Sequence, residues 1–284
     1  MIETDSRIFE RYVGIDYSGA RSARNGLPGL RVYRAEADAA AVEIRPISGK
    51  YHSRCGVHDW LLDVLAEATP TLVGIDHSFS FPLAYFEQHG LERNWDAFLE
   101  DFQRHWPTAD EDVTVESVRR GQFGNGAARG GSARARRVCE ISARAKSVFH
   151  FDVPGSVAKS THAGLPWLLR LRQHFGPSLH FWPFDGWEIA SGRSAVLEAY
   201  PALYSAAFPR EGRSIDQHDA YSIAAWLARA DASGELQAAL APVFPPSLAK
   251  VVEVEGWILG VPGLDRRAAG LREPRSRMPA RRLR

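Results

Sequence analysis

Val13-Gly-Ile-Asp-Tyr-Ser18 and Val73-Gly-Ile-Asp-His-Ser78 are two copies of one pattern, Val-Gly-Ile-Asp-x-Ser. In each copy a short apolar run, which suits a strand buried on both faces, ends in an aspartate. Open α/β sheets bind ligands at the carboxyl ends of their strands, and the pattern places Asp16 and Asp76 there. Strands that are neighbours lie about 5 Å apart, and carboxylates this close repel unless a proton or a cation joins them. The pair is therefore the first candidate for a metal site.

The composition is that of an ordinary globular protein. Of 284 residues, 45% are hydrophobic and 24% are charged, which fits one large domain better than three. The formal net charge of +1 points to no particular partner. Nearly all basic residues are arginine, the side chain suited to forked phosphate contacts, although a bias in genome composition gives the same pattern.

The two cysteines, Cys55 and Cys139, are too few for a disulfide framework or a cysteine-rich metal site. The first residues lack the apolar core of a signal peptide, and no apolar run approaches the roughly 18 residues that span a bilayer. We therefore expect a cytoplasmic protein with no membrane partner. The sequence leaves the oligomeric state open.

Periodicity predicts three strands, a helix and a fourth strand, and later a fifth strand and a closing helix. A mixed five-stranded sheet flanked by helices follows from this order. The segment 251–261 reads as a late strand or as a hydrophobic closing segment. The expected strands are 12–16, 31–35, 42–47, 71–76 and 195–200, and the expected helices are 57–67, 94–106, 165–175 and 216–230.

One domain covers residues 11–264, between an N-terminal extension, 1–10, and a disordered basic tail, 265–284. A long insertion is expected between the fourth and fifth strands. Within it, residues 107–145 are rich in Gly and Arg and poor in large apolar side chains, which favours a mobile loop. Its stretch 119–137 suits either a phosphate-contacting flap or a solvated insertion.

Further acids stand at the start of the last predicted helix. Asp216 and Asp219 are three residues apart, hence on one face. Asp216 has an alternative role as the N-cap of this helix. Asp219 lies beside Ala220, on the side that should pack against the sheet. A carboxylate there needs a partner or a cation, because burying a bare charge costs several kcal/mol.

A string of short motifs, in order, resembles domain-of-unknown-function family 429, which is described as predicted RNase H-like nucleases. The resemblance covers about residues 10–264, and the order of the motifs carries it rather than any one of them. The Asp-x-x-Asp-Ala helix start is also similar to the last motif of Holliday-junction resolvases. The motifs are Val13-Gly-Ile-Asp16, Gly74-Ile-Asp-x-Ser-x-Ser-Phe-Pro82, Arg137-Val-Cys-Glu140, Pro154-Gly-Ser-Val157, Ser160-Thr-x-Ala-Gly-Leu-Pro166, Glu198-Ala-Tyr-Pro201, Asp216-Gln-His-Asp-Ala220 and Glu255-Gly-Trp-Ile-Leu-Gly260.

The resemblance implies an RNase H-like fold and hydrolysis of phosphodiester bonds in nucleic acid, DNA or RNA, assisted by Mg²⁺ or Mn²⁺. By position, Asp16, Asp76 and Asp219 become catalytic metal ligands, and Asp216 a fourth ligand. Glu198 matches a motif of the family and is a further catalytic candidate. Its role is open, either as a ligand or as an acid that supports the site from beside Arg137 or Lys159.

Five residues are candidates for substrate contacts. Lys159 and His162 belong to a compact polar group that could bind phosphate or transfer a proton. The alternative is structural, with Ser160 or Thr161 as the N-cap of the next helix. The remaining candidates are Ser18, Ser78 and Arg137.

Two other functions compete with a nuclease. The loops after Asp16 and Asp76 resemble the phosphate loops of actin-like and sugar kinases, but such kinases need two copies of the fold, and this chain has room for one. A degenerate fold that binds nucleic acid or protein without cutting is the other alternative. The retained acids argue against it, because unpaired buried carboxylates are costly. Serine hydrolysis gains little support, since the chain has no Gly-x-Ser-x-Gly elbow.

Overall fold

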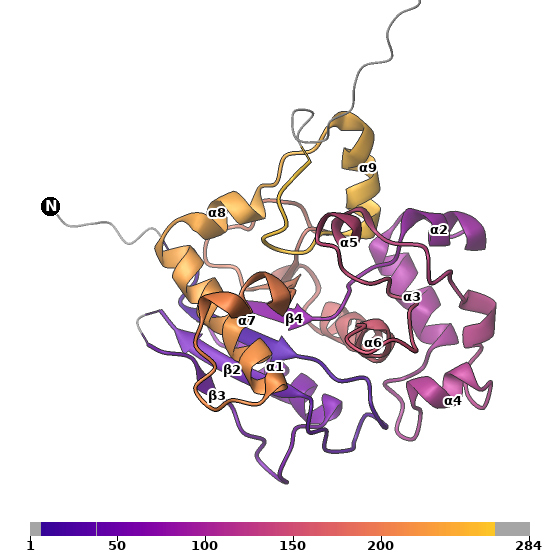
Figure 1. Cartoon of the computed structure of the whole chain (residues 1–284), viewed down its shortest axis with the longest axis horizontal. Coiled ribbons are helices and arrows are strands. Elements are labelled where there is room, and N and C mark those ends of the chain that lie inside the picture. Colours follow the sequence, from indigo (N-terminus) through magenta and orange to yellow (C-terminus); the bar gives the residue numbers. More distant parts are fainter. Residues whose placement is uncertain (1–6, 38, 265–284) are drawn as a thin grey trace, which may run out of the picture.

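The computed structural model describes residues 7–37 and 39–264, which form an α/β fold around a mixed sheet (Figure 1). The strand order is β3-β2-β1-β4-β6-β5. β1, β2 and β3 pair antiparallel, whereas β1 pairs parallel with β4, β4 with β6, and β6 with β5. The predicted sheet had five strands, and the structure adds the short edge strand β5. The strands are β1 Arg11–Asp16, β2 Arg31–Glu36, β3 Val42–Glu43, β4 Thr71–Asp76, β5 His180–Phe181 and β6 Ala195–Glu198.

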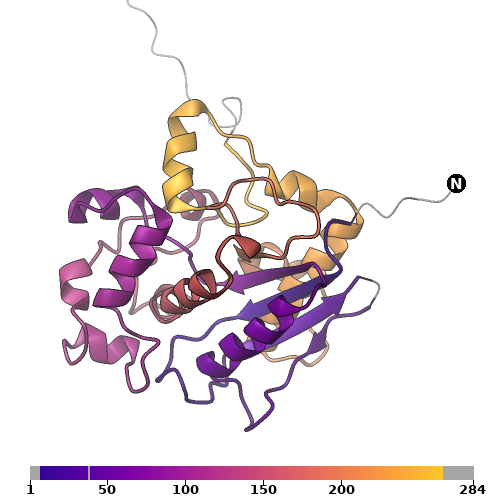
Figure 2. The same ribbon diagram turned by 180° about the vertical axis from the view of Figure 1, so that it is seen from behind.

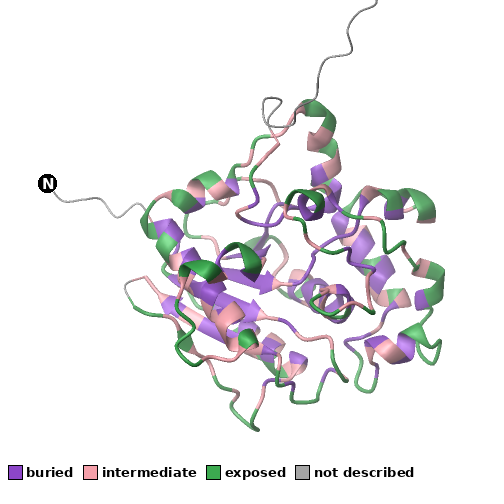
Figure 3. Cartoon of the chain, viewed as in Figure 1, coloured by how far each residue is buried: buried purple, intermediate pink, exposed green. Residues whose placement is uncertain are grey.

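Helices cover both faces of the sheet. Figure 1 shows α7 in front of the strands, and Figure 2 shows α1 on the opposite face. Strands β1 and β4 are buried along most of their length (Figure 3). The helices are α1 Arg54–Ala66, α2 Leu83–His89, α3 Trp95–His105, α4 Val115–Arg119, α5 Val138–Ser142, α6 Ala158–Phe175, α7 Ile215–Ala232, α8 Glu235–Leu240 and α9 Pro246–Glu255.

The two copies of the repeated pattern lie side by side in register. Val13 pairs with Val73, and the match continues residue by residue to Asp16 and Asp76. The glycines of the two copies let α7 approach the sheet closely. A Cβ atom on Gly14 would lie 2.2 Å from the backbone oxygen of Ala220, and one on Gly74 would lie 2.6 Å from a methyl carbon of Ile223. The repeat therefore forms both the strand pair and the surface on which α7 packs.

The segment 107–145 contains helices and so is not the continuous loop that was expected, although most of residues 119–136 are exposed. It contains α4 and α5 as well as a short 3₁₀ helix, Gly126–Arg129. Its glycines mark close contacts: a Cβ on Gly126 would lie 2.8 Å from the ring of Trp106, and one on Gly131 2.3 Å from the ring of Phe149. Arg129 donates a forked pair of hydrogen bonds to Asp101. Gly126 and Gly131 are thus places where aromatic rings meet the backbone, whereas Gly121 and Gly130 have no such neighbour.

The structure decides between alternatives at two other places, and one prediction falls outside the described residues. Residues 251–261 form the hydrophobic closing segment and not a strand, because they contain the end of α9 and then a single bridge from Ile258 to Glu198. Helix α6 begins at Ala158, so Ser160 and Thr161 lie inside it and neither is its N-cap. The predicted disordered tail lies outside the described residues. Among the residues that the structure describes, no helix is both long and apolar enough to cross a bilayer.

Candidate functional site

Four aspartates meet at the carboxyl end of β1 and β4. Asp16 and Asp76 are register partners at the ends of their strands. Each aspartate comes two residues after a glycine that contacts α7. Residues i and i+2 of a strand share a face, so both side chains lie on the α7 face. Asp216 and Asp219 come from the first two turns of α7, which the close packing on Gly14 brings down to the same edge. All four are partly exposed to solvent, so a ligand can reach them.

The N-cap of α7 is Ser214, and this excludes the alternative role of Asp216. The Ser214 hydroxyl accepts a hydrogen bond from the Gln217 amide, and the Gln217 side chain accepts one from the Ser214 amide. This reciprocal capping box provides hydrogen-bond partners for backbone N–H groups at the start of the helix. Asp216 is therefore not needed as a cap, and its carboxylate lies beside Gly29, which the Ser18 hydroxyl also adjoins.

The carboxylates act strongly on one another. Burial, together with the charges of Asp76, Asp216 and Asp219, raises the pKa of Asp16 to about 9, and the charge of Arg31 opposes this. Burial raises the pKa of Asp76 to about 8, with Asp219 and Glu198 adding to the effect. Burial also raises the pKa of Asp219. Burial and mutual repulsion thus make it unfavourable for all of these carboxylates to be charged at the same time.

The donor set suits a hard cation in its chemistry. It consists of carboxylate oxygens, and within residues 7–37 and 39–264 the carboxylates of Asp16, Asp76 and Asp219 make no hydrogen bond or ion pair. No three His, Cys, Asp or Glu side chains of the described residues are already positioned to hold a metal ion together. Mg²⁺ usually keeps several of its waters and takes only one or two carboxylates directly. Acids that lie near one another without all contacting a single ion are therefore compatible with Mg²⁺.

Arg31 is the cation beside the acids, and the sequence predictions missed it. Its Cα is the register partner of Asp16 across β1 and β2. Its guanidinium donates to Glu43 at 3.1 Å, and Glu43 in turn accepts a hydrogen bond from the Gln217 side chain of α7 at 2.9 Å. The sequence contained this information. If the chain turns back after Asp16 and pairs antiparallel, the first residue of the second strand, Arg31, lies opposite Asp16.

Glu198 differs from the four aspartates in its partners, although its charge still adds to the raised pKa of Asp76. It is the register partner of Ile75, one residue before Asp76, so its side chain leaves the opposite face of the sheet. There Arg137 holds it with two hydrogen bonds, at 2.7 and 2.5 Å, and the amide of Phe79 donates to it at 3.1 Å. Two roles were left open for Glu198, as a ligand or as a supporting acid. Its position fits an acid that supports the site from beside Arg137.

Arg137 and Ser78 are buried structural residues, so substrate contacts by either do not fit the structure. Arg137 is fully buried, and its guanidinium donates to Glu198, Glu140, the Ser78 hydroxyl and the backbone oxygen of Glu255. These bonds use all five donors of an arginine. None is left for a phosphate.

His162 is also a core residue and not a substrate contact. It is 1% exposed, its Nδ1 is bonded to the backbone oxygen of Ala158 at 2.8 Å, and burial lowers its pKa to about 3. Aromatic rings surround it: Phe81, Phe102, Trp106, Phe149 and Phe151. Lys159, by contrast, is exposed, and its backbone lies against Gly19 in the loop after Asp16.

Arg54 is a further residue that the sequence predictions missed. It is 1% exposed and donates hydrogen bonds to the backbone oxygens of Ser18, Ala20 and Arg21, at 3.0, 2.8 and 2.9 Å. It thereby fixes the loop that leaves Asp16 and carries the Ser18 hydroxyl. No local sequence signal marks an arginine of α1 as the clamp of a loop more than thirty residues away.

Comparisons of the chain with protein-family models, with curated proteins and with solved structures gave no match.

Proposed function

We propose that this protein is a divalent-metal-dependent nuclease with an RNase H-like fold, related to domain-of-unknown-function family 429. One observation carries the proposal: β1, β4 and α7 bring Asp16, Asp76, Asp216 and Asp219 to one edge, where burial and the neighbouring carboxylates raise the pKa of Asp16. The element order β1, β2, β3, α1, β4, β6, α7 supports the fold assignment, because the RNase H-like fold has this order of strands and acid-bearing helix.

In this proposal Asp16, Asp76 and Asp219, with Asp216 as an additional ligand, would hold Mg²⁺ or Mn²⁺, one or two of them directly and the others through waters on the ion. The bound ion would supply Lewis acidity for adding water to a phosphodiester and breaking one P–O ester bond. The protein has three tasks. Gly14 and Gly74 hold α7 close enough to bring Asp219 to the strand ends, Arg31 offsets part of the charge, and Arg54 fixes the loop that carries Ser18.

The test compares cleavage of single- and double-stranded DNA and RNA with Mg²⁺, with Mn²⁺ and with EDTA. We expect metal-dependent cleavage by the wild type, and a loss of about two orders of magnitude or more in Asp16→Asn and Asp219→Asn, since each removes charge from the site. Thermal unfolding provides a second readout. The metal ions should raise the melting temperature of the wild type and not that of the two variants.

Asp112→Asn is the matched control, because Asp112 is an exposed acid in the segment before α4. It should keep both cleavage and stabilisation by metal. Activity that survives both site substitutions would exclude the assigned ligands. Stabilisation by ATP without cleavage of any nucleic acid would instead favour the kinase alternative.

A further inference from the structure

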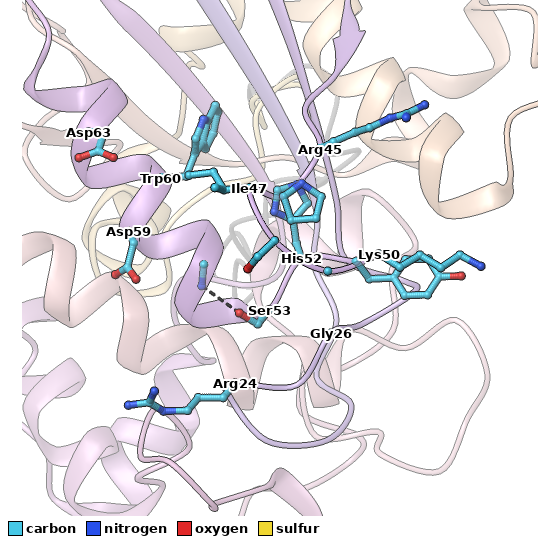
Figure 4. Close-up of a pocket in the computed structure, with 15 residues that line it drawn as sticks. Arg24, Gly26, Arg45, Ile47, Lys50, His52, Ser53, Asp59, Trp60 and Asp63 are labelled. Carbon is cyan, nitrogen blue, oxygen red and sulfur yellow. Dashed lines mark hydrogen bonds between the residues drawn. The ribbon is translucent and has the colours of Figure 1, made fainter.

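A cavity of about 470 Å³ lies between the N-terminal half of α1 and the segment 45–53, which follows β3 (Figure 4). Its volume is that of a small-molecule or mononucleotide site. The proposed function, as stated above, makes no use of it. Its lining includes three cationic side chains, two aromatic ones and two carboxylates: Arg24, Arg45, Lys50, Tyr51, Trp60, Asp59 and Asp63.

The two sides of the cavity differ in charge. Figure 4 shows Asp59, Trp60 and Asp63 projecting from α1 on one side, with Arg45 and Lys50 on the facing segment. In the described part of the chain, neither Arg45 nor Lys50 forms an ion pair, and both are exposed. A ligand that satisfies both sides carries negative charge along one edge and hydrogen-bond donors along the other.

Tyr51 and Arg31 connect this cavity with the acidic site. The guanidinium carbon of Arg31 lies 5.1 Å from the centre of the Tyr51 ring, and Lys50 Nζ lies 5.2 Å from the same ring. Arg31 is in turn the register partner of Asp16. Through these contacts Tyr51, which lines the cavity, adjoins Arg31, the residue opposite Asp16 at the edge of the sheet.

We infer that the cavity binds a single strand of nucleic acid and leads it to Asp16. Arg45 and Lys50 contact the phosphates, and Trp60 offers a face on which a base stacks. Asp59 and Asp63 accept hydrogen bonds from exocyclic amino groups, as carboxylates do with the amino group of cytosine. Bases with an amino group are therefore preferred over thymine or uracil. The inference rests on the proposed function, since it supplies the substrate of the same acidic site.

The test measures binding apart from cleavage, by fluorescence polarisation of labelled oligo(dC), oligo(dT) and duplex DNA in EDTA. The wild type should bind oligo(dC) more tightly than oligo(dT), and both more tightly than the duplex. The double variant Arg45→Ala/Lys50→Ala, and separately Trp60→Ala, should weaken binding of oligo(dC) by about tenfold. Asp59→Asn/Asp63→Asn should shrink the preference for oligo(dC). Lys250→Ala, an exposed lysine on α9, is the control and should bind as the wild type does.

The outcomes separate this inference from the proposed function. Unchanged binding in the Arg45/Lys50 and Trp60 variants, or equal binding of duplex and single strands, overturns the inference while metal-dependent cleavage still stands. Loss of cleavage in Asp16→Asn with normal binding of oligo(dC) supports both. A wild type that binds no oligonucleotide in EDTA overturns the inference, whatever the cleavage assay shows.

Discussion

At the scale of single residues, the polar side chains divide into those that form the site and those that hold the core. The pattern Asp-x-Ser was read as an acid followed by a substrate contact, yet the Ser78 hydroxyl is buried and bonded to Arg137. His162 likewise lies within aromatic rings contributed by distant segments. No local pattern could reveal this, because the burial of a polar side chain depends on residues that the fold brings to it.

His162 predicts a pH dependence of stability that is unrelated to the acidic site. Its pKa falls from 6.5 to about 3 on folding, so between these values the unfolded chain binds a proton that the folded protein does not. Its contribution to stability is therefore present at neutral pH and lost as the pH falls, by up to about 1.4 kcal/mol per pH unit. The substitution His162→Phe places another aromatic ring among these aromatic neighbours and removes the group that titrates.

Urea unfolding at pH 7 and at pH 5 tests this. Between these values the free energy of unfolding should fall by about 2 kcal/mol less in His162→Phe than in the wild type. The exposed His174 provides the control, and His174→Gln should follow the wild type. An identical pH dependence in all three proteins would contradict the assignment of His162 as a buried neutral residue.

At the scale of secondary-structure elements, the contact of α7 with β1 and β4 decides the geometry of the site. The sequence predicted both strands and the helix with its two aspartates, and the structure shows that the two strands are neighbours. It did not predict that the glycine of each repeated pattern is where the helix lies on the sheet. That contact depends on the distance between a strand and a helix far apart in the chain.

Gly14→Ala tests this contact. The new Cβ would lie 2.2 Å from the backbone oxygen of Ala220 and 2.6 Å from the backbone nitrogen of Ala224, and neither atom can rotate away. Helix α7 must shift, so we expect a loss of about 1–3 kcal/mol in unfolding free energy. Because Asp219 moves with the helix, stabilisation by Mn²⁺ should weaken as well.

The control is Gly130→Ala, since a Cβ there meets only the backbone oxygen of Ala127 at 3.7 Å. It should unfold like the wild type and respond normally to Mn²⁺. A stable Gly14→Ala variant with a full response to Mn²⁺ would show that the close approach of α7 does not position Asp219.

At the scale of the whole molecule, the charge is nearly balanced, with 35 Lys and Arg against 34 Asp and Glu. A protein of this kind binds a polyanion only through a local group of cations. The inferred strand site offers Arg24, Arg45 and Lys50, and Arg24 is already paired with Glu111. Electrostatic binding of a single strand should therefore be modest and confined to this region.

The salt dependence of binding checks that expectation. Two to three phosphate contacts give a slope of about −1.4 to −2.1 in log K against log salt concentration for a single strand. A titration of oligo(dC) binding between low and moderate salt measures the slope. Arg45→Ala/Lys50→Ala should reduce its magnitude by about 1.4, and Lys250→Ala should not change it. A much steeper slope in the wild type would place the main contacts elsewhere, for example along 119–137.

The general architecture could be predicted from the sequence, whereas parts of its periphery could not. The strongly apolar strands and the amphipathic helices follow from periodicity, and the convergence of Asp16 and Asp76 follows from two matching strand ends. Edge strand β5 has only two residues, too few to give a pattern. The packing of 107–145 escaped prediction because glycine serves equally in flexible loops and in tight contacts with rings.

The seating of α7 on Gly14 also has a consequence for synthesis on the ribosome. Strands β1 and β4 leave the exit tunnel early, whereas α7 follows only after about three quarters of the chain. Until then the sheet lacks the helix that covers its glycine face, and the four aspartates are not assembled. A chain released before residue 215 would expose this apolar face to chaperones and proteases. Truncated products should therefore be cleared or aggregate rather than persist as folded protein without the site.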